Sequence, residues 1–398
     1  MLNAIIDLRS PSMTITFYTN FINHHQVAIA DELYSLIGKN YTFIAMEPIP
    51  ETFVKNGYPD YSDRPYLLKA YESDDNRKKA KELALSSDIV IQGAVSNEYI
   101  LPRIKMSRIT FRYSERWFKK GYKSLFCPRS LYNYFANHTR FRNKPLYMLC
   151  ASAYTASDVA KVFAYPNKCY KWGYFPPTQQ MPIEELITAK RSSKTRILWV
   201  ARFIKLKHPE MLVKLARRLK DKGYAFEINM VGNGEMHNEI DQMVKELGVE
   251  DCVHLLGQFP NSQIHQLMRE HHIFCFTSDR NEGWGAVLNE AMSNGCCPVA
   301  ADMIGATQFL IKHKENGLTF ESENDEAFIS NIEYLINNPD ICEQMSKNAY
   351  YTIQKEWSPQ IAANRLLELC KALLNNEKYI QDSGPCSIAV AHHRDTIN

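Results

Sequence analysis

The sequence predicts an α/β protein made of two doubly wound domains, each a parallel sheet covered by helices. The chain has 398 residues, 45% of them apolar, which is enough to bury two cores. In both halves, short apolar runs alternate with helical stretches, the pattern of doubly wound sheets. Between the halves, the segment from Trp172 to Ser193 holds a glycine, adjacent prolines and then a polar run, and it predicts a hinge.

The individual elements follow from hydrophobic periodicity. In the first half, the sequence predicts strands at 14–19, 41–46, 89–92, 109–111 and 146–151, and a helix at 77–85. In the second half, it predicts strands at 196–201, 227–232, 254–256, 273–277 and 298–301. A helix over 209–222 has Leu212, Leu215, Ala216 and Leu219 on one face, and it begins with a proline whose missing N–H costs nothing there.

A polar glycine turn between the strand at 273–277 and a helix at 286–292 is the best candidate for an active site. Glu282 is expected in the loop and Glu290 about one turn into the helix. Backbone N–H groups from Gly283 to Val287 would face a ligand, because a helix N-terminus has unpaired donors that favour phosphate or hydroxyl groups. An ionised Glu290 could accept both hydroxyl protons of a ribose.

Two cations are expected at the same edge of the sheet. Arg202 directly follows the strand at 196–201, and Lys207 comes five residues later. Ligands bind at the carboxyl edge of such sheets. A guanidinium fork and an ammonium together could hold a diphosphate without metal. No Asp-x-Asp sequence occurs in the chain, which agrees with a site where cations replace a divalent ion.

With these residues in place, the stretch from Arg196 to about Trp357 resembles the nucleotide-binding half of a GT-B glycosyltransferase, specifically of glycosyltransferase family 4. The marks that carry the resemblance are Val-Ala-Arg202 with Lys207, Val231-Gly232-Asn233-Gly234-Glu235, Leu256-Gly257-Gln258-Phe259-Pro260, Thr277-Ser278, Glu282 to Glu290, Gly295 and Asn316-Gly317-Leu318. The resemblance implies two Rossmann-like domains that face a central cleft, and sugar transfer with retention of configuration.

The resemblance also implies roles for residues. Arg202 and Lys207 would grip the donor diphosphate and Glu290 the ribose. Glu282 and the backbone after it would hold the transferred sugar, and the turn near Phe259 the base; the residues after Glu282 are Gly283, Trp284, Gly285, Ala286 and Val287. Gly232 is counted on the donor side as well, although a tight turn from strand to helix is its first explanation.

The predicted division of the chain has five parts. They are an acceptor-binding domain at 1–172, a hinge at 173–193, a nucleotide-sugar-binding domain at 194–358, a helix at 359–376 that crosses back to the first domain, and a tail at 377–398. The tail lacks apolar periodicity, so the prediction for it is disorder. Adjacent His392 and His393 leave metal binding open there.

The first half departs from the family pattern. A glycine-rich loop after the first strand and a histidine after a middle strand are usual in the family, and neither is found here. The segments at those places are Asn20-Phe-Ile-Asn23-His24-His25 and Arg112-Tyr113-Ser114-Glu115-Arg116. Because both follow strands and should face the cleft, Asn23, His24, Glu115 and Arg116 are the acceptor-side candidates, and any of them is a hypothesis for the acceptor base.

Charge is unevenly distributed, although the net value is only +3. From Leu101 to Cys150 the only acid is Glu115, against twelve basic residues: Arg103, Lys105, Arg108, Arg112, Arg116, Lys119, Lys120, Lys123, Arg129, Arg140, Arg142 and Lys144. Interspersed aromatic residues suit an anionic membrane or a lipid diphosphate acceptor. A solvated face explains the run equally well, and nucleic acid is disfavoured because no motif for it accompanies the charge.

Composition excludes some classes of protein. No apolar run is long enough for a membrane span, and no signal sequence is recognisable, so a cytosolic protein is expected, with peripheral contact at the inner face of the cell membrane left open. Ten scattered cysteines without zinc-ligand spacing indicate reduced thiols.

The sequence thus predicts a retaining, metal-independent glycosyltransferase without a cofactor. The expected donor is a nucleotide diphosphate sugar, with a UDP-sugar favoured, and the acceptor is a glycan or a lipid-linked sugar of bacterial surface polysaccharide or glycolipid synthesis. A nucleotide-sugar 2-epimerase of the same fold and a non-catalytic nucleotide-sugar sensor stay open. An NAD-dependent oxidoreductase is disfavoured because the run from Val231 lacks the third glycine of the dinucleotide-binding motif.

Overall fold

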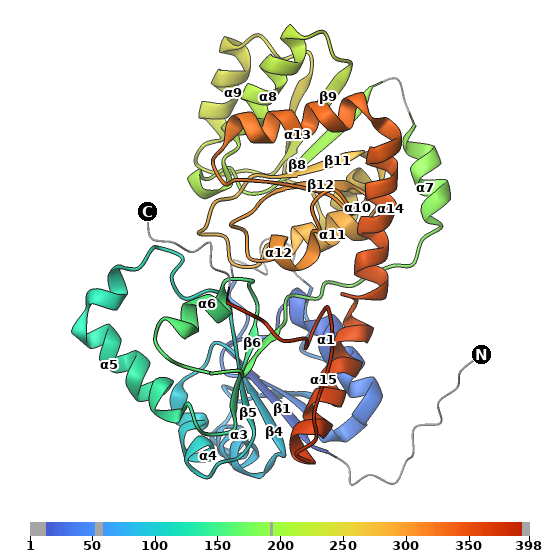
Figure 1. Cartoon of the computed structure of the whole chain (residues 1–398). Coiled ribbons are helices and arrows are strands. Elements are labelled where there is room, and N and C mark those ends of the chain that lie inside the picture. Colours follow the sequence, from blue (N-terminus) through green and yellow to red (C-terminus); the bar gives the residue numbers. More distant parts are fainter. Residues whose placement is uncertain (1–12, 52–58, 192–193, 392–398) are drawn as a thin grey trace.

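The computed structural model describes residues 13–51, 59–191 and 194–391, and in them it has two parallel sheets with helices on both faces (Figure 1). The first sheet has seven strands in the order β3-β2-β1-β4-β5-β6-β7. These strands are β1 (Ile15–Thr19), β2 (Tyr41–Ala45), β3 (Leu67–Lys69), β4 (Ile89–Gln92), β5 (Thr110–Ser114), β6 (Leu146–Cys150) and β7 (Cys169–Lys171). Every pair in it is parallel, as βαβ connections require.

The second sheet has six strands in the order β10-β9-β8-β11-β12-β13, again all parallel. They are β8 (Thr195–Val200), β9 (Phe226–Val231), β10 (Val253–Gly257), β11 (Ile273–Phe276), β12 (Cys297–Ala301) and β13 (Leu318–Phe320). All ten strands that the sequence predicts are present, with ends shifted by at most three residues. The prediction of two doubly wound domains is confirmed.

The helices cover both sheets. Those of the first domain are α1 (His24–Ile37), α3 (Asp74–Ser86), α4 (Leu101–Lys105), α5 (Pro128–Asn137) and α6 (Thr155–Ala160). Those of the second are α7 (Ile183–Lys190), α8 (Glu210–Asp221), α9 (His237–Glu246), α10 (Asn261–Glu270), α11 (Val287–Ser293), α12 (Thr307–Leu310), α13 (Asp325–Asn337) and α14 (Pro339–Lys355). Leu212, Leu215 and Leu219 of α8 are fully buried, as its apolar face predicts.

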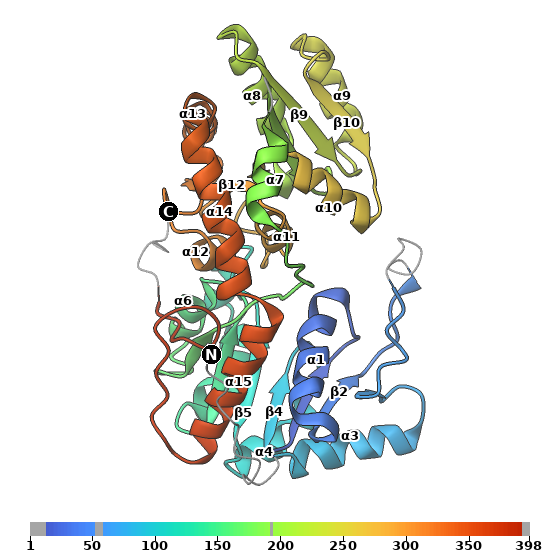
Figure 2. The same cartoon turned by 90° about the vertical axis from the view of Figure 1, so that its right-hand side faces the viewer.

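The last helix, α15 (Pro359–Leu374), belongs to the first domain in space. Helix α14 packs on α11 and β12 of the second domain, whereas α15 packs on α1 of the first (Figure 2). Ser358 begins α15, and its hydroxyl accepts the backbone N–H of Ile361. The chain therefore crosses back to the first domain between these two helices, as predicted.

Four aromatic side chains meet where the chain crosses between the domains. The ring of Trp284 lies 6.4 Å from Tyr174, 6.1 Å from Phe309 and 5.8 Å from Trp357, measured between centroids. A Cβ atom at Gly173 would overlap the Trp284 ring, so only glycine fits at this place. Part of the predicted hinge differs, because residues 183–190 form α7 and pack against α10 and α14.

Part of the predicted disordered tail also differs from the structure, because residues 386–389 pair with β7. Cys386 N–H donates to Lys171 O, Lys171 N–H to Ser387 O and Ala389 N–H to Cys169 O, at 2.8, 2.8 and 3.0 Å. The chain thus runs antiparallel beside β7. Backbone groups of an edge strand pair with any extended segment, whatever its side chains, which is why composition did not reveal this contact. His392 and His393 lie outside the described residues.

Not all of the basic residues between 101 and 150 lie on the surface. Arg103, Arg112 and Arg116 are buried. Arg103 donates to backbone oxygens that include Ser87 O at 2.6 Å, and Arg112 donates to Asn97 Oδ1 at 2.7 Å. These three guanidinium groups hold the first domain together and are not available to a ligand.

No helix in the described ranges is both long and apolar enough to cross a membrane.

Candidate functional site

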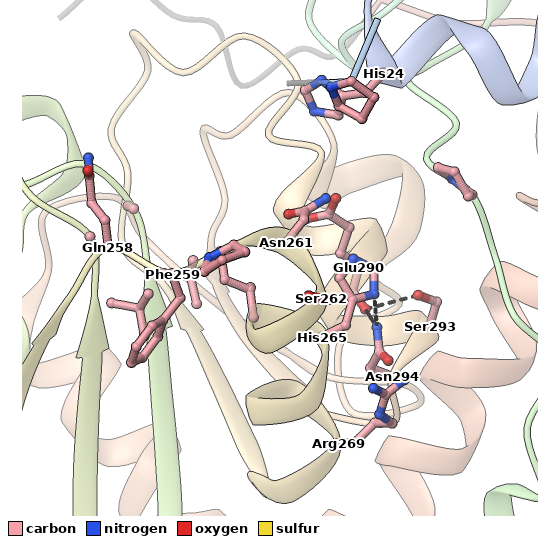
Figure 3. A pocket seen from close by; sticks show the side chains of 18 of the residues that line it. His24, Gln258, Phe259, Asn261, Ser262, His265, Arg269, Glu290, Ser293 and Asn294 are labelled. Carbon is pink, nitrogen blue, oxygen red and sulfur yellow. Dashed lines mark hydrogen bonds between the residues drawn. The ribbon is translucent and has the colours of Figure 1, made fainter. Parts of the chain in front are cut away.

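A cavity of about 820 Å³ lies between the domains at the carboxyl edge of the second sheet (Figure 3). Five of the predicted residues line it: His24 from α1, Arg202 after β8, Gly232 after β9, Phe259 after β10 and Glu290 in α11. Parallel strands bring their carboxyl ends to one edge, so residues far apart in sequence meet there. The cavity is large enough for a ligand of nucleotide size.

Glu290 is 8% exposed and points toward the cavity (Figure 3). Burial raises the pKa of its carboxyl to about 7, and a hydrogen bond from Asn261 opposes this increase. The prediction that it lies in the first turn of a helix is confirmed. A buried carboxylate with one amide partner keeps acceptor capacity for two hydroxyl groups.

The two predicted cations differ in their surroundings. The Arg202 side chain is exposed on the cavity wall and makes no hydrogen bond or ion pair with the residues that the structure describes. Lys207 is instead paired with Glu282, and both side chains are mostly covered. Its ammonium group also lies 5.7 Å from the centroid of the Phe276 ring. Lys207, predicted to bind the diphosphate, is therefore paired with Glu282, predicted to bind the sugar.

The loop that follows Glu282 leads into α11, which begins at Val287. In the part of the chain that is described, the backbone N–H groups of 283–287 donate to no other residue. Gly285 has a φ of 86°, a conformation that favours glycine. The loop thus combines unpaired donors with the buried Glu290 one turn later.

The Trp284 side chain does not line the cavity. It is fully buried, and its indole N–H donates to Asn289 Oδ1 at 2.9 Å. Its role is to anchor the loop in the aromatic contact with Tyr174 and Trp357. Trp284 was predicted on the donor side. Because its side chain is buried away from the cavity, only its backbone could take that role.

Gly232 has the structural role that was its first explanation. Its φ is 136°, and a Cβ atom there would overlap Ala201 O. The chain leaving β9 passes directly over the chain leaving β8, and this close approach lets Gly232 line the cavity beside Arg202.

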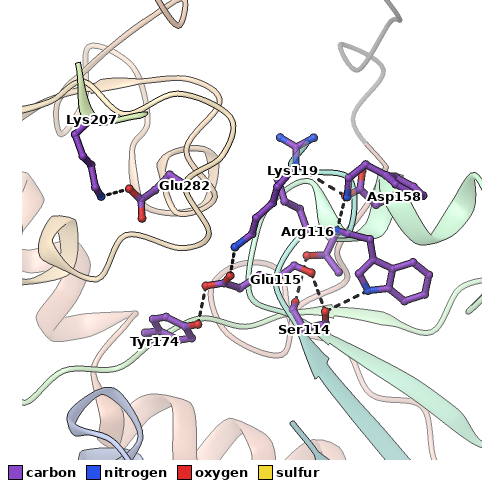
Figure 4. Close-up of polar contacts among 11 residues, drawn as sticks. Ser114, Glu115, Arg116, Lys119, Asp158, Tyr174, Lys207 and Glu282 are labelled. Atoms are coloured by element: carbon purple, nitrogen blue, oxygen red, sulfur yellow. Dashed lines mark hydrogen bonds and ion pairs between the residues drawn. The ribbon is translucent and has the colours of Figure 1, made fainter. Parts of the chain in front are cut away.

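Among the acceptor-side candidates, Glu115 is the one that reaches the donor loop. A Cβ atom at Gly283 would overlap the Glu115 carboxylate, so the two residues lie directly against each other across the domains. Tyr174 OH donates to Glu115 Oε1 at 2.6 Å, and Lys119 is paired with Oε2 (Figure 4). This carboxylate is oriented from two sides.

The other three candidates have different surroundings. His24 lines the cavity, and burial lowers its pKa to about 4, so the ring is neutral near pH 7. Asn23 caps α1 by accepting the N–H of His25 at 3.0 Å. Arg116 was predicted to face the cleft, but its side chain is 0% exposed and lies beside Asp158 at 3.9 Å. The strand preceding it turns this guanidinium into the first domain.

Sequence reasoning missed Tyr174 and Lys119, which orient Glu115, and the polar residues below Glu290. Among the latter, Asn261 starts α10, and the side-chain amide of Asn294 donates to His265 Nδ1 at 3.2 Å. Asn261 directly follows Phe259-Pro260, so its place in the turn was a usable signal. Tyr174 gave no such signal, because it lies in the hinge and is far in sequence from Glu115 and Trp284, which it contacts.

Two facing Rossmann-like domains with a last helix that crosses back define the GT-B fold. The crystal structure of HepE from Anabaena in complex with UDP is similar, with a TM-score of 0.66 over 90% of this chain and 100% of that one. Its sequence identity of 14% makes this a likeness of fold. Residues 183–352 match the model of the family "Glycosyl transferases group 1".

Curated relatives match over less than half of the chain. An uncharacterized glycosyltransferase of Haemophilus influenzae is 31% identical over 170 residues, which are 43% of this chain and 46% of the relative. The amylovoran biosynthesis glycosyltransferase AmsK of Erwinia amylovora is 27% identical over 183 residues, 45% of each chain. A Campylobacter jejuni alpha-1,4-N-acetyl-D-galactosaminyltransferase, whose name gives a diphospho-undecaprenol-linked sugar as acceptor, is 25% identical over 175 residues, 42% of this chain and 47% of the relative. Each match spans just under half the length of the relative.

The raised pKa of Glu290 leads to a prediction on pH. The carboxyl is ionised above about pH 7 and protonated below it, and the ionised form accepts two hydroxyl protons. The affinity for a nucleoside diphosphate should therefore fall by up to about tenfold per unit as pH drops below 7. Isothermal titration with UDP from pH 5.5 to 8.5 measures this.

Glu290→Gln is the matched control, because it keeps the shape and removes the titration. Any pH dependence that it retains belongs to the phosphates of the ligand. Equal pH dependence in both proteins would show that Glu290 does not bind the ribose.

Proposed function

We propose that the protein is a retaining glycosyltransferase that transfers a sugar from a nucleotide diphosphate sugar, UDP-sugar favoured, without a metal ion at the diphosphate. The observation that carries the proposal is one cavity that presents an unpaired Arg202 and a buried Glu290 at the carboxyl edge of a parallel sheet. A guanidinium suits a diphosphate, and a buried carboxylate suits a ribose diol. The group 1 match covers both residues, and the Anabaena structure of similar fold holds UDP.

The loop residues complete the donor side of the proposal. Lys207 has three N–H donors and uses one on Glu282, so it can also donate to a departing phosphate. Arg202, Lys207 and the free N–H groups of 283–287 would stabilise the charge that develops on the diphosphate. Glu282 would hold the sugar, and Phe259 would contact the base from the turn after β10.

Retention follows if the acceptor attacks from the face that the diphosphate leaves. The leaving phosphate oxygen then lies next to the acceptor hydroxyl and can take its proton. Glu115 lies against Gly283 and is the carboxylate that could orient this hydroxyl. Its contacts with Tyr174 and Lys119 come from the hinge and the first domain, whereas Gly283 belongs to the second, so the distance between Glu115 and Gly283 depends on how the two domains face each other.

The proposed acceptor is a glycan or a lipid-linked sugar. Two cations flank the ring of Tyr122 in the first domain, with Lys161 at 4.9 Å and Arg280 at 5.5 Å from its centroid. Arg280, which precedes Glu282 by two residues, also donates to Phe118 O of the first domain. Positive charge beside the donor loop suits an acceptor that carries a diphosphate, like that in the name of the Campylobacter relative.

Membrane contact is part of the proposal and rests on one patch, which we call the α5 patch. It consists of Phe126, Leu131, Tyr132 and Phe135, which are 82%, 45%, 69% and 56% exposed. Figure 1 shows α5 at the outer edge of the first domain. From Arg116 to Ser157 the sequence has no acidic residue. Exposed aromatic side chains among Lys and Arg favour the inner, anionic face of a cell membrane over a solvated surface.

The donor side is tested by thermal shifts with UDP, GDP, ADP and NAD. At a hundred times its dissociation constant, a ligand adds about 2.7 kcal/mol to stability, a shift of several degrees. One nucleoside diphosphate should raise the Tm of the parent and of the surface control Arg218→Ala, and should leave Arg202→Ala and Glu290→Ala nearly unshifted. A shift with NAD alone, or with no ligand, would contradict the transferase proposal.

Turnover separates the remaining classes of function. Incubation of the nucleotide sugar with acceptor should give a glycoside with the anomeric configuration of the donor. Product formed without acceptor would indicate an epimerase, and binding without any product a sensor. An inverted glycoside would contradict the proposed geometry.

Glu115→Gln tests the acceptor side. It keeps the hydrogen bond from Tyr174 and removes the charge, so we expect kcat to fall about a hundredfold, the range of acid–base catalysis, while the Tm shift with nucleotide is kept. Glu98→Gln, an exposed change in the same domain, should leave kcat as in the parent. Unchanged turnover in Glu115→Gln would remove Glu115 from the reaction.

The α5 patch is tested by sedimentation with vesicles of phosphatidylglycerol and phosphatidylethanolamine. Phe126→Ser with Phe135→Ser should weaken binding at least about tenfold, because each buried Phe contributes about 1.5–3 kcal/mol. Leu36→Ser with Leu85→Ser removes two exposed apolar residues elsewhere in the domain and should change nothing. Parent binding that is absent, or equal with neutral vesicles, would contradict membrane contact.

A further inference from the structure

Three potential metal ligands from separate loops meet beside the candidate site. His208 follows the short helix at 205–207, Asp279 follows β11, and Glu323 follows β13. One ligand atom of each lies within 4.8 Å of the others. None of the three lines the large cavity, so this cluster is separate from Arg202 and Glu290.

The imidazole of His208 is oriented as in metal sites. Its Nδ1 lies 2.9 Å from Glu210 Oε1, and its Nε2 faces Asp279 Oδ2 at 3.7 Å. Nε2 is buried and has no hydrogen-bond partner among the described residues. Metal-bound histidines commonly donate their other ring N–H to a carboxylate, which fixes the tautomer and the ring. Glu210 fills that position here.

The distances suit a small ion. Zinc bonds of about 2.0–2.1 Å to nitrogen and oxygen in a tetrahedral site place the ligand atoms about 3.3 Å apart. The separation of 3.7 Å between Nε2 and Asp279 Oδ2 is longer than a hydrogen bond and close to this value. Asp279 is held by Asn281, whose backbone N–H donates to Oδ1 at 2.7 Å.

The backbone supports the same placement. His208 adopts a left-handed conformation with φ 49° and ψ 53°. Glu323 has a φ of 64°. Such residues cost of order 1 kcal/mol or more and persist where surrounding contacts fix them. Both turns direct the side chains of His208 and Glu323 toward Asp279.

We propose that His208, Asp279 and Glu323 bind a divalent cation, with zinc preferred and Glu210 as the partner that orients the histidine. An imidazole nitrogen selects zinc over magnesium and calcium, which prefer sites made only of oxygen. Water completes the coordination. The proposal does not depend on the transferase activity, because none of the three ligands lines the large cavity.

The ion would fix the loops that carry the donor residues. His208 directly follows Lys207, and Asp279 precedes Glu282 by three residues. A hydrogen bond from Asp279 N–H to Leu206 O, at 2.9 Å, already joins the two loops. A metal bound to both loops and to the one after β13 holds the pair of Lys207 and Glu282 in place.

The proton is the competitor of the metal. The two carboxylates beside His208 raise its pKa to about 9, so without metal a protonated ring would bridge Asp279 and Glu210. Metal binding must displace this proton. A protonated His208 between the two carboxylates and a metal-bound His208 use the same side chains, but only the second arrangement binds zinc.

Isothermal titration of the metal-stripped full chain with zinc chloride at pH 8 distinguishes them. The parent should bind one zinc ion, and magnesium chloride should give no comparable binding. His208→Asn, whose new residue tolerates the left-handed backbone, and Glu323→Gln should weaken binding by at least about tenfold. Their Tm without metal checks that both variants fold.

The control is His392→Asn with His393→Asn, which removes the adjacent histidines of the tail and should keep the affinity of the parent. If the parent binds no zinc, or if His208→Asn binds it as tightly as the parent, the proposal is wrong. In the first case the cluster is an ion-pair network around a protonated imidazole. In the second the ion binds elsewhere.

Discussion

The packing of one indole ring, that of Trp284, positions everything else around the candidate site. It lies against the hinge at Tyr174, against Phe309 of α12 and against Trp357 at the start of the crossover. The loop that supplies Glu282 and the free N–H groups is therefore anchored in the same place where both connections between the domains pass. Because the Trp284 ring is fully buried in this contact, shifting the loop means moving the hinge and the crossover together.

Glycines make this arrangement possible at the edge of the second sheet. Gly232 lets two chains cross directly, and Gly283 leaves room for the carboxylate of Glu115 from the other domain. At each place a larger residue would separate groups that must be close. The lack of a side chain at Gly232 and Gly283 thus allows contacts that a larger residue would prevent.

Sequence reasoning succeeded where the physical signal is local. Strand β4 is a short, continuous apolar run, and helix α15 has helical apolar spacing and a serine cap, so their positions were predictable. Arg202, Gly232 and Phe259 were found because each follows a strand at the same sheet edge, and Glu290 because it lies in the helix that follows β11. Non-local features were not predictable. Arg116 turns inward to Asp158, Tyr174 reaches Glu115 from the hinge, and the tail pairs with a strand more than two hundred residues away.

That last pairing affects how the protein behaves among other copies of itself. β7 is the end strand of the first sheet, and without residues 386–389 part of its row of N–H and C=O groups would be open to any passing extended chain. The short segment 386–389 thus protects this edge of the first sheet from pairing with another copy of the chain. Proteolytic trimming of the C-terminus would then promote self-association, although residues 386–389 do not line the cavity between the domains.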